Sequence, residues 1–279
     1  MNAITYLFVP ATHTDRIAKA FAAGAHAVIV DLEDAIDPAD KLTAREQLAG
    51  FLASSAPPVW VRVNAVTTQW FADDMLMLQA QRDGVAGIML SKTESKADLD
   101  KTAVTSGSAL PVIALIESAR GVLALGDICS HASVVRLAFG SADLSSDLGC
   151  EDSHEALLGA RAQLVLQSSA ARLPAPIDGV TFSVDDMSLI REDAARAARM
   201  GFGAKLCIHP SQLSPTLEGF SPSERDVLWA QKIVAATAGH AGAIKLDGKM
   251  VDKPVIARAR LILGQHAACQ TVPSRPTIP

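Results

Sequence analysis

Short apolar segments recur along the chain, separated by longer stretches in which apolar residues follow a helical spacing. Each apolar segment is about six residues long, and most end at charged residues or at Pro, Gly or Asn, which is typical of buried strands. The predicted strands are Ile4–Pro10, Ala27–Leu32, Val59–Asn64, Gly87–Lys92, Pro111–Ile116, Val134–Phe139, Ile177–Phe182 and Ala204–Ile208. The predicted helices are Asp15–Phe21, Asp37–Leu52, Trp70–Arg82, Ser95–Thr105, one that ends near Ile128, Ser153–Arg172, Ser188–Met200 and Ser221–Ala238.

This alternation predicts an α/β fold, a closed (βα)8 TIM barrel, over residues 1–238. An open dinucleotide-binding sheet would need a glycine-rich loop after its first strand, whereas Pro10–His13 contains no GxGxxG. Residues 239–279 form a separate C-terminal segment. Its glycines predict a mobile excursion over 239–253, followed by a short helix over Val255–Gln265.

The composition disfavours several classes of protein. The net charge of −5 comes without a concentrated basic patch, which disfavours nucleic-acid binding. No apolar run reaches the length of about 18 residues that a membrane span needs, and the start predicts no secretory signal. The four cysteines are scattered without a CxxC pair, which indicates reduced thiols in a cytoplasmic protein.

Polar residues gather where the predicted strands end, which is where barrel enzymes carry their active groups. Glu117 follows the fifth strand, and Asp143 lies in the loop after the sixth. Two such carboxylates can bind Mg2+ together with water, or each can cap the helix that follows it. The residues alone leave both interpretations open.

Other strand-end residues also have two interpretations. Arg62 can clamp a substrate carboxylate, or pair with Asp31, Glu33 or Asp34 on the neighbouring strand. Lys92 can form a Schiff base or, as we favour, an ion pair with Glu94 or Glu117. His209 could act as an acid or base, but we favour a structural role for it. For Asp185-Asp186 we favour a solvated helix start over a pair of metal ligands.

Seven segments together resemble the citrate lyase β-subunit-like family, relatives of malyl-CoA, citramalyl-CoA and citryl-CoA lyases within the 2-keto-acid aldolase superfamily. They are Leu7–Pro10, Val30–Ala35, Val61–Asn64, Ile116–Ala119, Phe139–Leu144, Ile208–Pro210 and Gly248–Asp252. Two positions depart from the family pattern, Ala11 where Gly is frequent and Ser91 where Pro is common, and both touch loops near the expected CoA entrance.

The resemblance implies a homotrimeric or hexameric barrel with Mg2+ on Glu117 and Asp143. It assigns the oxo-acid carboxylate to Arg62 and support of metal-bound water to Glu33 and Asp34. It also implies a C-terminal lid segment that brings the catalytic Asp252 to a neighbouring subunit's site.

The expected reaction is reversible cleavage of a 3-hydroxyacyl-CoA into an acyl-CoA and an oxo acid such as glyoxylate, pyruvate or oxaloacetate. The alternatives are a metal-dependent pyruvate aldolase that does not use CoA and a non-catalytic barrel that binds an acidic metabolite. Candidates for binding the CoA phosphates are Arg16 and Lys19, with Lys41 and Arg45 beside them, but for these four residues we favour ordinary solvated helix faces.

Overall fold

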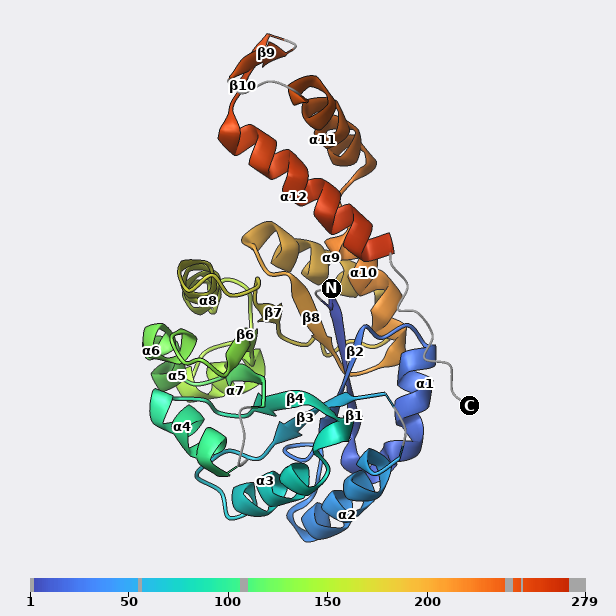
Figure 1. The fold of residues 1–279 in the computed structure, drawn as a ribbon, viewed down its shortest axis with the longest axis vertical. Coiled ribbons are helices and arrows are strands. Elements are labelled where there is room, and N and C mark those ends of the chain that lie inside the picture. The colour runs from blue at the N-terminus through green and yellow to red at the C-terminus, as the bar shows by residue number, and fades with distance from the viewer. Residues whose placement is uncertain (1–2, 55–56, 106–109, 239–242, 247, 271–279) are drawn as a thin grey trace.

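A computed structural model describes residues 3–54, 57–105, 110–238, 243–246 and 248–270. Eight parallel strands pair in chain order, and β1 pairs with β8, so the sheet closes into the predicted barrel (Figure 1). The strands are β1 (Thr5–Pro10), β2 (Ala27–Asp31), β3 (Val59–Val63), β4 (Val85–Leu90), β5 (Val112–Ile116), β6 (Val134–Phe139), β7 (Ile177–Asp178) and β8 (Ala204–Cys207).

Helices connect and surround the strands. Short 3-10 turns, η1 to η4, lie at Ala11–Arg16, Pro38–Asp40, Arg82–Gly84 and Pro210–Gln212. The helices of the barrel are α1 (Ile17–Ala22), α2 (Lys41–Leu52), α3 (Phe71–Ala80), α4 (Lys96–Thr105), α5 (Ala119–Leu123), α6 (Leu125–Cys129), α7 (Ser141–Leu148), α8 (Leu158–Ala170), α9 (Met187–Met200) and α10 (Leu213–Phe220).

The alternation of side chains along each strand produces two apolar layers. One set fills the inside of the barrel and includes Ile29, Met89 and Leu115. The other set, which includes Val30 and Ile116, packs against the surrounding helices. The strands are buried on both faces and mostly apolar, with Arg136 in β6 and Lys205 in β8 as buried charged exceptions. The carboxyl ends of the strands carry most of the predicted site residues.

The region after β6 differs from the prediction. Asp143 does not lie in a loop but in the first turn of α7, a helix that the sequence pattern did not indicate. The helix predicted from Ser153 begins only at Leu158, and β7 keeps two residues of the predicted six. Gly149 ends α7 in the left-handed conformation, with a φ of 64°.

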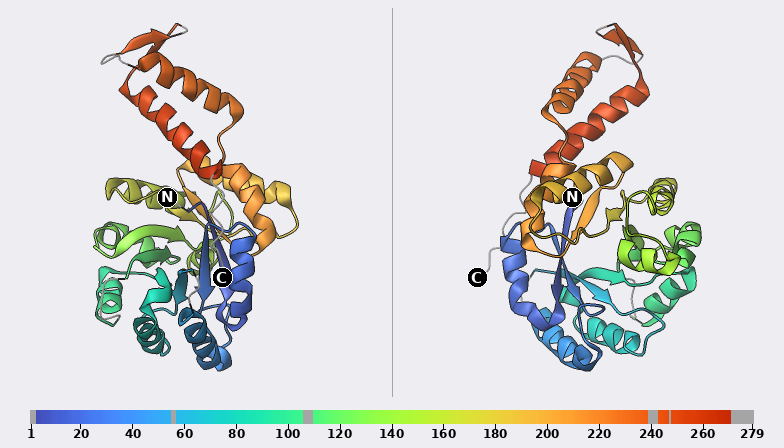
Figure 2. Two further views of the ribbon diagram at one scale, coloured as in Figure 1. Left: turned by 45° about the vertical axis from the view of Figure 1, so that its right-hand side comes forward. Right: turned by 180° about the vertical axis from the view of Figure 1, so that it is seen from behind.

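The C-terminal arm, defined as α11 (Glu224–Thr237), β9 (Ile244–Leu246), β10 (Lys249–Val251) and α12 (Lys253–Gln270), stands away from the barrel in every view (Figures 1 and 2). Its two helices pack on each other and on the β9–β10 hairpin around Val227, Ile233 and Val251. Helix α11, which we expected to close the barrel, therefore lies in the arm, and α10 covers β1 and β8 instead.

Details of the arm also correct the prediction. Ser223 and not Ser221 caps α11, accepting a hydrogen bond from the N–H of Asp226. The expected short helix is 18 residues long. Of the expected mobile excursion, residues 239–242 and 247 lie outside the described residues, and most of the remainder forms the antiparallel β9–β10 hairpin.

Two expectations about the class of protein can be compared with the structure. No helix in the described ranges combines the length and apolar character that crossing a membrane requires. All four cysteines are free thiols, as their spacing predicts.

We propose that the chain divides near Pro222, because the buried residues of the arm form a cluster separate from those of the barrel. A chain that ends at Pro222 should keep its cooperative unfolding transition in urea. Its free energy of unfolding should fall by only about 1–2 kcal/mol, because the arm packs on the barrel core chiefly through the partly buried Ala268 and Cys269. Loss of the cooperative transition would contradict this division.

Candidate active site

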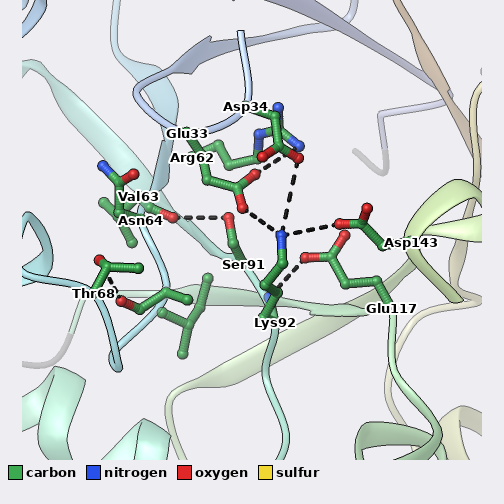
Figure 3. Close-up of polar contacts among 12 residues, drawn as sticks. Glu33, Asp34, Arg62, Val63, Asn64, Thr68, Ser91, Lys92, Glu117 and Asp143 are labelled. Carbon is green, nitrogen blue, oxygen red and sulfur yellow. Dashed lines mark hydrogen bonds and ion pairs between the residues drawn. The ribbon is translucent and has the colours of Figure 1, made fainter. Parts of the chain in front are cut away.

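A pocket of about 370 Å3 opens at the carboxyl ends of the strands. Its wall is partly apolar, with Phe8, Leu115, Phe139, Phe182 and Leu206 among the lining residues. Four of the predicted site residues line it as well: Asp34, Arg62, Glu117 and Asp143. The structure therefore brings together side chains from four separate loops and strand ends, as Figure 3 shows.

Glu117 follows β5 directly and is 5% exposed. Its Oε1 accepts a hydrogen bond of 2.7 Å from the backbone N–H of Lys92. The other oxygen, Oε2, fits against Gly140, where a Cβ atom would lie only 2.6 Å away. Burial, and secondarily the negative charge of Glu33, raises the pKa of Glu117 to about 8.

Asp143 reaches the same place from α7 and is partly exposed. Its Oδ2 accepts a hydrogen bond of 3.0 Å from Nζ of Lys92. Neither Glu117 nor Asp143 serves as the side-chain cap of a helix, because Ser118 caps α5 and α7 has no side-chain cap. The structure thus disfavours the capping interpretation of this pair.

The donor set fits Mg2+. Each carboxylate uses one oxygen on Lys92, so Oε2 of Glu117 and Oδ1 of Asp143 are the atoms that would hold the ion. In the described part of the chain, no group of three or more His, Cys, Asp or Glu side chains is arranged as a metal site. Two carboxylates suffice for Mg2+, which usually keeps water and takes further oxygens from the substrate.

Arg62 forms the ion pair that was the alternative to substrate binding. Its Nε and Nη2 each donate a hydrogen bond of 2.6 Å to Asp31, which lies beside it in the β2–β3 register. Nη1 lies 3.2 Å from Oε2 of Glu33, and the guanidinium stacks over Phe8. Although burial alone would raise the pKa of Asp31, the charge and hydrogen bonds of Arg62 hold it below its ordinary value. Arg62 still lines the pocket, so the two roles are compatible.

Glu33 and Asp34 follow β2 in a loop that Asp31 organises, because its carboxylate accepts the N–H groups of Glu33 and Ala35. Glu33 is buried, and its Oε1 accepts a hydrogen bond of 2.8 Å from Nζ of Lys92. Burial raises the pKa of Glu33, and the nearby cations oppose this only in part. Asp34 is exposed and lies 3.9 Å from the same ammonium group.

The sequence singles out Lys92 at its strand end but does not indicate the partners of its ammonium. We expected it to pair with Glu94 or Glu117, but only its backbone contacts Glu117, and its ammonium lies between Glu33 and Asp143. Burial lowers the pKa of this ammonium, yet the two carboxylates outweigh burial and raise it. A permanently charged amine is a poor nucleophile, which argues against the Schiff-base interpretation.

Asp252 lies outside this pocket. It joins β10 to α12 in the arm, where its side chain is exposed and accepts a hydrogen bond from the N–H of Val255. In Figure 1 this junction lies at the end of the arm that is remote from the barrel. Within one chain, the structure does not bring Asp252 to the pocket.

The basic candidates and the remaining strand-end residues occupy different environments. Arg16 and Lys19 are exposed on η1 and α1, and Lys19 lies 3.8 Å from Asp15. Lys41 is a structural residue, since its buried ammonium donates to the carbonyls of Leu32 and Glu33 and to Asn64. Arg45 pairs with Asp73 and Asp74, His209 caps η4, and Asp186 caps α9.

A closed parallel barrel with carboxylates and an arginine at the carboxyl ends of its strands belongs to the class of α/β-barrel enzymes. The family model described as HpcH/HpaI aldolase/citrate lyase matches residues 5–210. The chain therefore belongs to this family, and the resemblance seen in the sequence is confirmed.

Individual relatives match along most of the chain. A citrate lyase subunit beta-like protein of Mycobacterium tuberculosis is 35% identical over 266 residues, 92% of this chain and 93% of that protein. A (3S)-malyl-CoA thioesterase of Cereibacter sphaeroides is 31% identical over 271 residues, 94% of each. The crystal structure of protein CitE from M. tuberculosis in complex with magnesium, acetoacetate and coenzyme A aligns with a TM-score of 0.83 at 33% identity, over 95% of this chain and 98% of that one.

The raised pKa of Glu117 predicts a dependence of stability on pH. The folded metal-free protein binds this proton more tightly than the unfolded chain, so its free energy of unfolding should fall as pH rises from about 4.5 to about 8. The slope from this group is at most about 1.4 kcal/mol per pH unit. Urea unfolding in EDTA should show this slope reduced in Glu117→Gln and kept in Glu151→Gln, which alters an exposed carboxylate. Equal slopes in both variants would contradict the assignment.

Proposed function

We propose that this protein is a Mg2+-dependent carbon–carbon lyase that cleaves, or forms, a 3-hydroxyacyl-CoA such as malyl-, citramalyl- or citryl-CoA. The products of cleavage are an acyl-CoA and an oxo acid. One observation carries the proposal: Glu117, directly after β5, and Asp143, in the helix that follows the neighbouring strand β6, line one pocket with Arg62. The relative whose structure contains magnesium, acetoacetate and coenzyme A supports the choice of cofactor and ligands.

The residues of the pocket have distinct tasks in this scheme. Magnesium on Glu117 and Asp143 supplies Lewis-acid stabilisation of developing negative charge. Arg62, which Asp31 holds in place, orients the carboxylate of the oxo acid and adds positive potential. The apolar side chains of Phe8, Leu115 and Phe139 limit hydration, so these charges act in a medium of low polarity.

We further propose that Asp252 acts in trans and exchanges a proton with the methyl carbon of the acyl-CoA. The arm begins just after α10, and in Figures 1 and 2 its base lies on the side of the barrel where β1 starts, which is the amino end of the strands. The arm therefore starts at the end of the barrel opposite its own pocket. A second copy of the chain is the natural recipient of Asp252, which favours a homotrimer or hexamer.

Hydrolysis of the thioester is a second candidate reaction, favoured by the relative that is named a (3S)-malyl-CoA thioesterase. It would use the same metal and the same carboxylated substrate, but it would break the C–S bond in place of the C–C bond. The products separate the two reactions, because hydrolysis releases the free thiol of CoA whereas lyase cleavage releases an oxo acid and keeps the thioester.

With Mg2+ and malyl-, citramalyl- or citryl-CoA, we expect an oxo acid, measured as its phenylhydrazone, without free thiol, measured with a thiol reagent. Glu117→Gln should lower the rate by about 100-fold or more, because it removes one of two metal ligands. Glu151→Gln is the matched control and should retain the rate. Free thiol without oxo acid would identify a thioesterase, and neither product from any of the three substrates would contradict the proposal.

Asp252→Asn should abolish turnover while sparing binding of the oxo acid to the barrel. When Asp252→Asn and Glu117→Gln chains are co-expressed, mixed oligomers should recover about a quarter of the unaltered activity, because a site with an intact barrel then receives an intact arm from its neighbour. Activity no greater than that of either variant alone would contradict action in trans.

A further inference from the structure

We propose that Lys92 is the positioning residue of the metal site and sets both carboxylate ligands at once. Its backbone N–H holds Glu117, and its ammonium holds Asp143. The inference rests on the proposed function in taking these two carboxylates as the metal ligands. It adds a residue that acts on the ion only through them.

The two contacts of Lys92 occupy one oxygen atom of each carboxylate and leave the other oxygen atom available. Lys92 binds Oε1 of Glu117 at 2.7 Å and Oδ2 of Asp143 at 3.0 Å. One oxygen of each group then remains for the ion, which suits the single-oxygen coordination that a small Mg2+ ion can accept from each carboxylate. Because both contacts come from one residue, the separation of the two ligands depends on the conformation of Lys92.

The backbone of Lys92 is held in an unusual conformation. Its φ is +47°, and among the described non-glycine residues only Arg172 shares a positive φ. A left-handed conformation costs a residue with a side chain about 1–2 kcal/mol, so it persists only where the surroundings enforce it. Here it directs the N–H of Lys92 toward Glu117.

The neighbours of Lys92 enforce this conformation. On one side, Oγ of Ser91 donates a hydrogen bond of 2.8 Å to the carbonyl of Val63, as Figure 3 shows. On the other side, Thr93 donates its N–H to the carbonyl of Leu115 and its hydroxyl to that of Leu90. Gly121 packs so closely on this turn that a Cβ atom would lie 2.7 Å from the carbonyl oxygen of Thr93. The turn is therefore fixed on both sides of Lys92.

Glu33 fixes the other end of the side chain. It binds the ammonium of Lys92 at 2.8 Å, opposite Asp143, and lies 3.2 Å from Arg62. The ammonium is thus held between two carboxylates and is not free to follow Asp143 if that side chain moves. Glu33 acts on the metal site through Lys92.

A different role for Lys92 would give the opposite result. If the ammonium merely occupied the position of the metal ion between the carboxylates, it would compete with the metal, and its removal would strengthen metal binding. If Lys92 positions the ligands, its removal weakens metal binding, since loss of a group that orients a metal ligand typically costs about 10–100-fold in affinity. The sign of the change distinguishes the two roles.

The test measures Mn2+ affinity, by the electron paramagnetic resonance of free Mn2+, on the full-length chain without substrate. Lys92→Met and Lys92→Gly should each weaken binding by about 10–100-fold, and Lys92→Arg should recover part of the loss. Glycine accepts a positive φ, so this variant keeps the test valid if Lys92→Met fails to fold. The matched control, Lys96→Met, removes an exposed positive charge four residues away and should leave the affinity within about twofold.

Unchanged or tighter Mn2+ binding by the folded Lys92 variants would overturn the inference, as would an unaltered chain that binds no Mn2+. Its failure is distinguishable from failure of the proposed function. An active lyase whose Lys92 variants bind Mn2+ normally would refute only the role of Lys92. A chain whose Mn2+ affinity depends on Lys92 as expected, but that converts none of the thioesters, would refute only the reaction.

Discussion

Repulsion among carboxylates at the carboxyl ends of β2, β5 and β6 is the constraint on which the site depends. Asp31, Glu33, Asp34, Glu117 and Asp143 converge there, and three of them are buried. Arg62 neutralises chiefly Asp31, and Lys92 is shared between Glu33 and Asp143. Burial is the main cause of the raised pKa of Glu117, and the negative charges of Glu33 and Asp143 add to it while Lys92 opposes it. Two cations therefore face five carboxylates. A divalent cation would complete the balance.

The barrel brings these groups together without burying them in its apolar interior. Strand pairing places Asp31 beside Arg62 and aligns Ile116 with Phe139, just before the two proposed metal ligands. Glycine at position 140 leaves space for the carboxylate of Glu117. The arm follows a different principle, because its own apolar cluster lets it fold as a unit and extend away from the pocket. In the scheme proposed above, the barrel holds the metal ion and the arm brings Asp252 to the pocket of another copy of the chain.

Much of this arrangement could be predicted from the sequence, because short apolar runs identify buried strands and acidic residues at their ends identify the site. Helix α7 could not, since Ser141–Leu148 mixes polar residues that also favour turns. Helix α11 has a clear apolar face, but periodicity does not say which surface that face contacts. The role of Lys92 escaped for a similar reason: its partners Glu33 and Asp143 are 59 and 51 positions away, and its left-handed backbone leaves no pattern in the sequence.

The bidentate pairing of Arg62 with Asp31 has a consequence for recognition. A flexible arginine loses most of its rotational freedom when it first grips an anion, and this loss weakens binding. Here two hydrogen bonds to Asp31 and the ring of Phe8 immobilise the guanidinium in the folded protein, before any anion binds. An incoming anion would bind a side chain whose conformational entropy was already lost on folding. Selectivity for the shape of the anion can therefore be high even when few contacts are made.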